Sequence, residues 1–283
     1  MNPSPSPAAN VAARRQCGHR QTRRLAQRFD AAAPEYERYA GVQPAVADHL
    51  LACITEQTLP PAPRILEIGC GTGLLSRKLA ARFPDATWTI TDLAPAMLEQ
   101  ARRSLRLNQG ARFLIMDGEH PEPSLADPGF DLICSSMVVQ WFSAPAQGMA
   151  RLAGLLAPGG CLAVAVPVEG TWTEWRAAHR SLGLRPAMIP LPSAACLQAP
   201  HAAFQATVHT QRYIEACDSG LDFLRRLRGI GATAPRPGSQ PMTVSQLRRV
   251  CAAFEQAGAQ SSYRIAFSLW RRHGAARRAE ETL

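Results

Sequence analysis

Apolar residues along the chain follow two spacings that alternate. Short runs rich in β-branched residues and leucine are typical of buried strands, and the stretches between them repeat apolar residues every three or four positions, as one face of a helix does. The expected strands cover residues 64–68, 87–91, 112–116, 130–135 and 161–166. Strand and helix in alternation predict a doubly wound α/β fold built on a parallel sheet.

Helical spacing connects these strands and extends beyond them at both ends. Connecting helices are expected from Leu74, from Pro95 and at 149–156, and two leading helices at 22–33 and 44–58. After the fifth strand the pattern predicts helices at 171–182, 193–204, 220–228 and 244–257 and strands at 205–214 and 262–270. Because 46% of the 283 residues are hydrophobic, the chain has enough apolar surface for one large globular domain.

Eight cysteines are scattered through the apolar elements, with no Cys-x-x-Cys and no cysteine–histidine pair at ligand spacing. This distribution predicts buried free thiols, a reducing compartment and therefore a cytoplasmic location, and it gives no reason to expect a metal site. No apolar run approaches the ~20 residues of a membrane span.

The net charge of +9 is concentrated at the two ends of the sequence. The first 29 residues contain arginine and no acidic residue, and residues 212–278 are again rich in arginine. Such a surface attracts an acidic partner, although solvated arginines on helix faces look the same in sequence. Residues 1–21 are predicted to be a disordered basic arm, or alternatively a transit peptide, ahead of a domain at 22–283. We expect no nucleic-acid partner.

Glycines at alternate positions follow the first strand, at Gly69, Gly71 and Gly73. In a strand-to-helix turn they permit positive φ and close approach of a ligand, and the N–H groups of the following helix favour an anionic group. A dinucleotide site needs its third glycine three residues after the second, which this spacing lacks. The loop therefore predicts a nucleotide cradle of another kind, or a turn with no ligand.

With Glu67 two residues ahead, the loop resembles the first motif of class I S-adenosylmethionine-dependent methyltransferases. The resemblance implies S-adenosylmethionine as cofactor, with Glu67 near its ammonium group and the glycines beside its methionine portion. It also implies a seven-stranded, mostly parallel sheet with an antiparallel last strand, helices that lead into the fold, and a helical lid at about 167–205.

Two more expected strands end in an acid. Asp92 lies where a ribose diol can bind, and its alternative role is to stabilise the start of the next helix. In the methyltransferase pattern Asp117 faces the adenine amino group. The same resemblance implies further cofactor contacts from Leu93, Met97, Gly118 and Ser135.

The resemblance narrows to the malonyl-acyl-carrier-protein O-methyltransferases of biotin synthesis. It rests on segments spread over about 22–270: Arg28–Ala33 with Tyr36, the loop Glu67–Gly73, Asp92–Leu98, Ser135–Ser136 with Gln140–Trp141, and Phe223–Ala232. It implies methyl transfer to the free carboxylate of a malonyl thioester on an acyl-carrier protein. An ionised carboxylate needs no general base, so alignment and desolvation suffice.

On the substrate side the expected residues are Tyr36, Gln140, Trp141 and Arg185. Tyr36 and Trp141 also suit ordinary packing. Arg185 matches the family pattern, and its guanidinium fork suits a carboxylate, with Arg176 as second choice. In the lid, Ala187–Pro190 departs from the polar residues usual in the family.

Three other interpretations follow from the same residues. One is a relative of the same family that assists respiratory-complex assembly and acts as an arginine hydroxylase, which a transit peptide would favour. Another is a methyltransferase of a small lipophilic ring, suited by the apolar Met137, Val138, Val139 and Ile189. The last is a binding protein without turnover, although Glu67, Asp92 and Asp117 argue against it.

Overall fold

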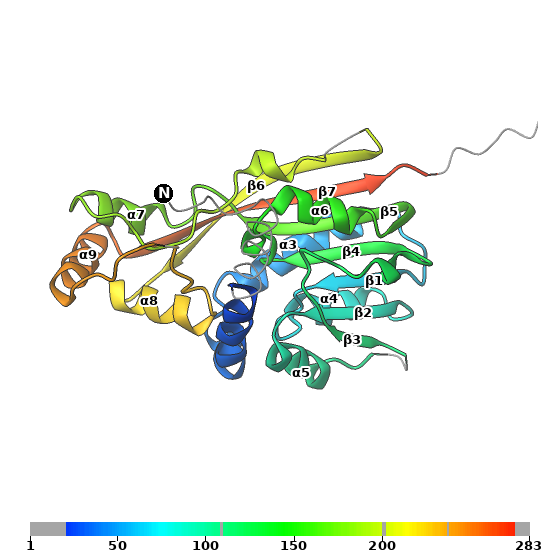
Figure 1. Cartoon of the computed structure of the whole chain (residues 1–283), viewed down its shortest axis with the longest axis horizontal. Coiled ribbons are helices and arrows are strands. Elements are labelled where there is room, and N and C mark those ends of the chain that lie inside the picture. Colours follow the sequence, from blue (N-terminus) through cyan, green and yellow to red (C-terminus); the bar gives the residue numbers. More distant parts are fainter. Residues whose placement is uncertain (1–20, 108–109, 200–201, 237, 275–283) are drawn as a thin grey trace, which may run out of the picture.

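Seven strands form one mixed sheet in the computed structural model, which describes residues 21–107, 110–199, 202–236 and 238–274. The strand order is β3-β2-β1-β4-β5-β7-β6. Only β7 is antiparallel to its neighbours, so the expected sheet is confirmed (Figure 1). The strands are β1 (Arg64–Ile68), β2 (Thr87–Asp92), β3 (Arg112–Ile115), β4 (Phe130–Ser136), β5 (Leu156–Pro167), β6 (Phe204–Ala216) and β7 (Gln260–Arg272).

Helices cover both faces of this sheet, because its central strands are apolar on both sides. Ile65 of β1 faces a core shared with α3 (Gln43–Thr55), α4 (Leu74–Arg82) and α5 (Pro95–Ser104). Leu66, the next residue, faces a second core under α6 (Pro145–Ala153) and the 3₁₀ turn η4 (Ala194–Leu197). The alternation of side chains along one strand thus divides the interior into two layers, as a doubly wound fold requires.

A helical lobe is built on the long ends of β6 and β7, which run past the other strands in Figure 1. It contains α7 (Thr173–Arg180), α8 (Gly220–Gly229) and α9 (Val244–Gln256). Trp175 contacts both Phe223 and Phe254, with ring centroids 4.9 and 5.4 Å apart. This aromatic cluster holds one residue from each helix together.

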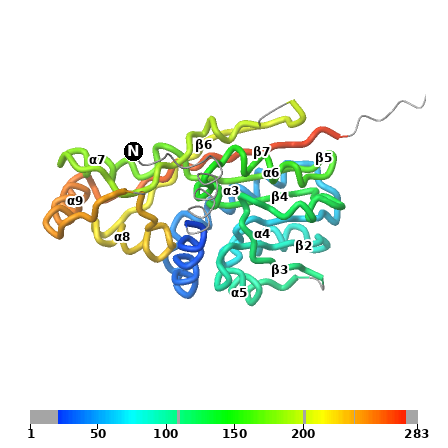
Figure 2. The backbone as a smooth tube through the Cα atoms, in the orientation of Figure 1, coloured from blue at the N-terminus to red at the C-terminus, as the bar shows by residue number. Residues whose placement is uncertain are grey.

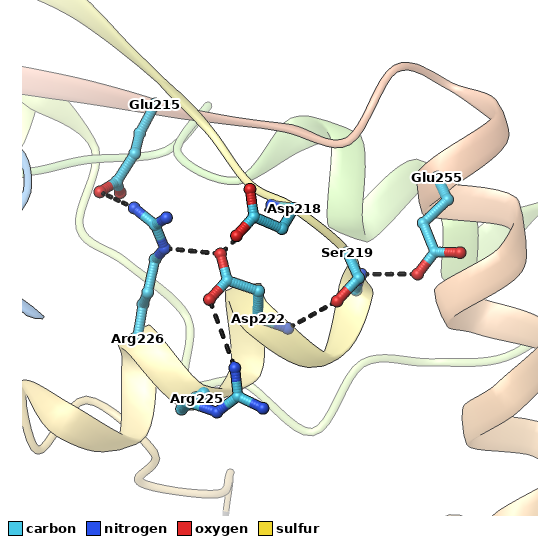
Figure 3. Close-up of polar contacts among 8 residues, drawn as sticks. Glu215, Asp218, Ser219, Asp222, Arg225, Arg226 and Glu255 are labelled. Atoms are coloured by element: carbon cyan, nitrogen blue, oxygen red, sulfur yellow. Dashed lines mark hydrogen bonds and ion pairs between the residues drawn. The ribbon is translucent and has the colours of Figure 1, made fainter.

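An ionic network fixes α8 to the strand before it (Figure 3). Arg226 donates at 2.8 Å to both Glu215 of β6 and Asp222 of α8. Ser219 accepts the N–H of Asp222 as the helix N-cap, and Glu255 of α9 accepts the N–H of Gly220. Arg226 is therefore part of the internal structure of the lobe.

The leading segments lie between this lobe and the sheet (Figure 2). They comprise a helix over 21–32, the 3₁₀ turn η1 (Ala33–Glu35) and α2 (Tyr36–Tyr39), followed by α3. The α2 segment packs on α8, and η1 packs on α5. The Tyr39 ring occupies the space that a side chain at Gly229 of α8 would need, because a Cβ added to Gly229 would lie 2.2 Å from the ring. The sequence predicted two leading helices, and the structure confirms both.

Three expected boundaries are wrong. The helix predicted at 193–204 is only η4, because the Leu197 carbonyl accepts hydrogen bonds from Ser268 and Trp270 of β7. The helix expected at 149–156 begins at Pro145 and ends at Ala153. Its start is fixed by the Glu119 carboxylate, which accepts the Ala144 N–H from a distant loop. The fifth strand, predicted at 161–166, is longer and spans Leu156–Pro167.

The predicted basic arm at 1–21 lies outside the described residues except for its last position. Among the helices of the described ranges, none has the length and apolar character that a membrane crossing requires. The lid expected at about 167–205 corresponds to α7 and the loop after it, and its role as a lid stays a prediction.

Candidate active site

The glycine loop between β1 and α4 forms the turn that the sequence predicted. Gly69, Gly71 and Gly73 have φ of 66°, 54° and 89°, a region that side chains other than glycine rarely adopt. A Cβ on Gly69 would lie 2.4 Å from the Val138 side chain, so that position has no room for one. At Gly71, by contrast, a Cβ would meet nothing within 4 Å. The open space beside Gly71 gives a ligand direct access to the backbone.

Glu67, near the end of β1, is buried below this loop. Its side chain is 2% exposed and accepts a hydrogen bond of 2.5 Å from Ser76 of α4. Burial raises the pKa of the Glu67 carboxyl to about 8, and the Ser76 hydrogen bond opposes that shift. A carboxyl held without a cationic partner in this way is suited to receive the charge of a ligand ammonium group.

Asp92, at the end of β2, links the loop to the next helix. One of its oxygens accepts the Gly71 N–H and the other accepts the Ala94 N–H, each at 2.8 Å. Burial raises the pKa of Asp92 to about 6, while these backbone hydrogen bonds lower it. The remaining lone pairs of its two oxygens are available to hydroxyl donors. After it come half-buried Leu93 and buried Met97, the latter packed against Ala33.

The remaining predicted cofactor residues lie at the ends of β3 and β4. Asp117 accepts the Glu119 N–H at 3.0 Å and lies 3.1 Å from Nδ1 of His120. A side chain at Gly118 would lie 2.2 Å from Ile68, so only glycine fits. Ser135 donates to the Ile68 carbonyl at 2.9 Å and thereby ties β4 to β1. Cofactor contact by these residues stays a prediction.

Two adjoining cavities open at the carboxyl ends of the parallel strands. The smaller, about 380 Å³ including its open mouth, is lined by Glu67 and the glycine loop. The larger, about 530 Å³, lies between the sheet, the leading segments and the helical lobe. Tyr36, Gln43 and Met137 line both cavities. A group bound in one cavity therefore meets a group bound in the other at these three side chains.

Tyr36, Gln140 and Trp141 all line the larger cavity, as a substrate site requires. Gln140 donates to the Met137 carbonyl at 2.7 Å, and Met137 itself has a φ of 58°. Trp141 meets Phe29 of the leading helix edge to face, with ring centroids 5.7 Å apart. Burial, and after it the Asp92 carboxylate, raises the pKa of Tyr36, so its hydroxyl is a donor at neutral pH.

The predicted arginines lie apart from this lining. Arg185 is exposed in the loop after α7, which contributes Met188 and Ile189 to the cavity wall. Arg176 is half-buried and donates to the Thr171 carbonyl at 3.4 Å, and burial lowers its pKa. Substrate contact by either arginine stays a prediction.

Gln43 lines both cavities, although no sequence motif singles it out. It is the first residue of α3 and 6% exposed, and its Oε1 accepts no hydrogen bond from the described residues. The same holds for Oε1 of Gln140. Buried polar atoms rarely lack a hydrogen-bond partner, and Gln43 and Gln140 both line the larger cavity. The available signal was a polar residue directly before the apolar positions at the start of α3.

The structure explains the two glycines in the segment Phe223–Ala232, one of the segments that carry the family resemblance. Gly229 makes room for Tyr39, and Gly231, with a φ of 71°, makes room for Phe29. Ile230 and Ala232, which alternate with these glycines, line the larger cavity. The segment thus joins the leading helices to the substrate side of the site.

The residues of the smaller cavity, together with Asp92, which accepts the N–H of Gly71 in its wall, fit S-adenosylmethionine. A buried carboxyl suits its ammonium group, the acceptors of Asp92 suit its ribose, and the open side of Gly71 admits its methionine portion. Fold and site together define a class I S-adenosylmethionine-dependent methyltransferase. A family described as a methyltransferase domain matches residues 66–162.

The chain belongs to the malonyl-[acyl-carrier protein] O-methyltransferase family. A protein of that name from Magnetococcus marinus is 35% identical over 241 residues, which are 84% of this chain and 88% of that protein. The biotin biosynthesis bifunctional protein BioCD of Bordetella avium is 48% identical over 88% of this chain. The matched region is 52% of BioCD, so the chain spans about half of that relative.

Solved structures support the fold. A putative methyltransferase from Bacillus halodurans matches 80% of this chain and 99% of its own, with a TM-score of 0.55 and 13% identity. A putative methyltransferase solved with the Trm112 activator of Haloferax volcanii matches with a TM-score of 0.53 and 16% identity over 88% of this chain and 97% of its own. At these identities the likeness concerns the fold alone.

Proposed function

We propose that this enzyme transfers a methyl group from S-adenosylmethionine to the free carboxylate of a malonyl thioester carried by an acyl-carrier protein. The observation that carries the proposal is the shared wall of Tyr36, Gln43 and Met137 between the two cavities. The names of the relatives from Magnetococcus marinus and Bordetella avium support the substrate and its place in biotin synthesis.

On the cofactor side the protein acts by holding and orienting. S-adenosylmethionine, when bound, supplies an electrophilic methyl group. Glu67 receives the ammonium group, Asp92 accepts hydrogen bonds from the ribose, and the glycine loop lets the backbone approach. Because Asp92 also accepts the Gly71 N–H, the same carboxylate that binds the ribose sets the shape of the loop.

On the acceptor side the protein supplies neutral hydrogen-bond donors. Tyr36 is protonated at neutral pH, and the Gln43 side chain has an amide donor at the shared wall. Neutral donors orient a carboxylate while leaving it more nucleophilic than a close ion pair would. The carboxylate is ionised at neutral pH, so the chain's contribution is alignment and exclusion of water. Arg185, from the exposed loop, is the proposed cation for substrate capture.

The acidic carrier is proposed to dock on the helical lobe. Arg228 of α8 and Arg248 and Arg249 of α9 are exposed, and no ion pair to them occurs among residues 21–107, 110–199, 202–236 and 238–274. Arg225 and Arg226 also belong to the arginine-rich region at 212–278, but both pair with Asp222, and Arg226 pairs with Glu215 as well, so they are left out of the docking surface. Ile230, which lines the larger cavity, follows Arg228 by two residues, so one end of the docking surface belongs to the segment that forms the cavity wall.

The test is incubation of the full chain with S-adenosylmethionine and malonyl-carrier protein, read by intact mass for one added methyl group. Arg185→Ala should lower turnover on malonyl-carrier at subsaturating concentration, mainly through a raised KM because the arginine is exposed, and leave cofactor affinity near wild type. Exposed Arg106 provides the matched control as Arg106→Ala, which should be inert. Normal turnover in Arg185→Ala would remove Arg185 from the site. A wild-type enzyme that ignores malonyl-carrier would remove the malonyl substrate.

A small lipophilic acceptor is the second candidate. The observation in its favour is that, among the residues that the structure describes, no charged side chain lines the larger cavity, whose wall includes Met137, Met188, Ile189, Leu191 and Ile230. The two candidates separate in a competition assay: a malonyl-carrier substrate should be methylated in preference to lipophilic alcohols and phenols of similar size. Preference for the latter would favour the second candidate.

We propose a cytoplasmic location because the described cysteines form no disulfide bonds. The seven cysteines that the structure describes are all free, and six of them are buried. Free thiols persist in reducing compartments.

A further inference from the structure

Three potential metal ligands meet outside the residues that line the two cavities. His49 and Cys53 lie one turn apart on α3, and His209 lies opposite them on the edge strand β6. The Nε2 atoms of His49 and His209 are 3.2 Å apart. One ligand atom from each of the three residues lies within 4.8 Å of the other two.

Neighbouring side chains hold both imidazoles in place. The rings of His49 and His209 stack on Phe267 of β7, with interplanar angles of 16° and 15°. Nδ1 of His49 lies 3.3 Å from the Tyr213 hydroxyl. A hydrogen bond to the far ring nitrogen is the usual support of a metal-binding histidine, because it leaves the near nitrogen directed at the ion. Here the near nitrogen of His49 is directed at His209.

Geometry and charge are compatible with one bound cation. An ion about 2.0–2.1 Å from both nitrogens would subtend an angle of roughly 100°, close to tetrahedral. The exposed Glu56 carboxylate acts electrostatically on both Cys53 and His209, and its charge favours a cation between them. Burial raises the pKa of the Cys53 thiol, so binding must displace its proton.

We propose that His49, Cys53 and His209 bind one divalent transition-metal ion of the zinc class, with water as the fourth ligand. Two imidazoles and a thiolate are a donor set that such ions prefer to magnesium or calcium. The ion would clamp β6 to α3, and β6 has β7 as its only strand partner in the sheet. The sequence prediction missed the pair His49 and Cys53, which are four residues apart and therefore share one face of a helix, and it could not place His209, which enters from a strand far along the chain from α3.

The test is titration of the reduced full chain with Co²⁺, followed by displacement with Zn²⁺. We expect one equivalent of Co²⁺ to give the visible bands of a tetrahedral ion and a sulfur-to-cobalt charge-transfer band. Cys53→Ser should abolish the charge-transfer band, and His209→Gln should weaken the affinity at least tenfold. Cys17→Ser, Cys196→Ser and His120→Gln are matched controls and should leave both features unchanged.

Thermal unfolding gives a second measurement on the wild-type chain. Stoichiometric Zn²⁺ should raise the Tm of the wild type and have a smaller effect on His209→Gln, because only the native clamp binds the ion. Absence of the cobalt bands in the wild type would overturn the proposal, as would a spectrum and affinity unchanged in either Cys53→Ser or His209→Gln. In those cases the two imidazoles share a hydrogen bond only.

Discussion

Two carboxyls, buried at the ends of β1 and β2, are the proposed partners of the cofactor's ammonium group and ribose. Glu67 and Asp92 are 2% and 8% exposed, and burial raises the pKa of each. Asp92 is held by two backbone N–H groups, whereas the one hydrogen bond to the Glu67 carboxyl comes from a serine hydroxyl. We therefore expect Glu67 to be the group whose protonation changes on binding.

Cofactor affinity should rise with pH below about pH 8. Burial raises the pKa of Glu67 from its ordinary value of 4.5 to about 8. The neutral carboxyl therefore contributes fully to the stability of the folded protein below pH 4.5, and this contribution is lost as the pH rises through about 8. A bound ammonium group favours the ionised form, so binding releases a proton, and affinity increases by up to about tenfold per pH unit in this range. Calorimetry in buffers of different ionisation heat measures the proton. Glu67→Gln should flatten the profile, and equal wild-type affinity at pH 6 and pH 8 would contradict this.

Asp92→Ala should weaken S-adenosylmethionine binding by about 2–4 kcal/mol, because the ribose hydroxyls lose a charged acceptor. The variant should also unfold more easily, since the Gly71 N–H loses its acceptor. Calorimetry and thermal unfolding measure the two effects separately. Asp85→Ala, an exposed acid before β2, is the control and should change neither. If a folded Asp92→Ala protein binds S-adenosylmethionine with unchanged affinity, Asp92 does not bind the ribose.

At the scale of elements, the contact between α2 and α8 joins the leading segment to the helical lobe across the substrate cavity. It depends on Gly229, whose missing side chain leaves room for the Tyr39 ring. Tyr36, one turn earlier on α2, lines both cavities. The spacing of these two helices therefore sets the position of Tyr36 where the two cavities adjoin.

Gly229→Ala should destabilise the protein by about 1–3 kcal/mol through overpacking, although alanine is the better helix former. Because α2 must move, turnover should fall more than cofactor affinity. Chemical denaturation gives the first quantity and initial rates the second. The neighbouring exposed position supplies a control, Arg228→Ala, which should leave stability within about 0.5 kcal/mol. A Gly229→Ala protein as stable as wild type would show that Tyr39 moves away without cost.

At the scale of the whole molecule, the sequence predicted the parallel core well and the additions to it less well. Runs of apolar and β-branched residues identify β1, β2, β4 and β5 because those strands are covered on both faces, and β3, which has no buried residue, is identified by its own short apolar run. The local apolar pattern fails where a residue distant in the sequence determines the backbone conformation. The Leu197 carbonyl accepts hydrogen bonds from Ser268 and Trp270, which prevents the expected helix. Gln43 was missed for the same reason, since its importance depends on two cavities formed by other elements.

Docking of an acidic carrier on the lobe should make catalysis sensitive to salt. Rim charges act mainly on association, so the apparent KM for malonyl-carrier should rise steeply with ionic strength, while that for a small malonyl thioester should hardly change. Arg248→Glu with Arg249→Glu should reproduce the effect at low salt. Arg106→Glu, which changes charge elsewhere, is the control. Equal salt dependence for carrier-bound and small substrates would argue against docking on this lobe.

The position of β7 between β5 and β6 has a consequence for how the chain is made. Strand β6 pairs only with β7, yet more than forty residues separate the two strands in the sequence. While the ribosome is still synthesising α8 and α9, β6 has no strand to pair with, and the outer edge of β5 is open. Nascent chains stalled before Gln260 should therefore contain a protected core of five strands followed by a protease-sensitive remainder. Synthesis of the last strand would complete the sheet and the substrate cavity in one step, since Tyr263 of β7 lines that cavity.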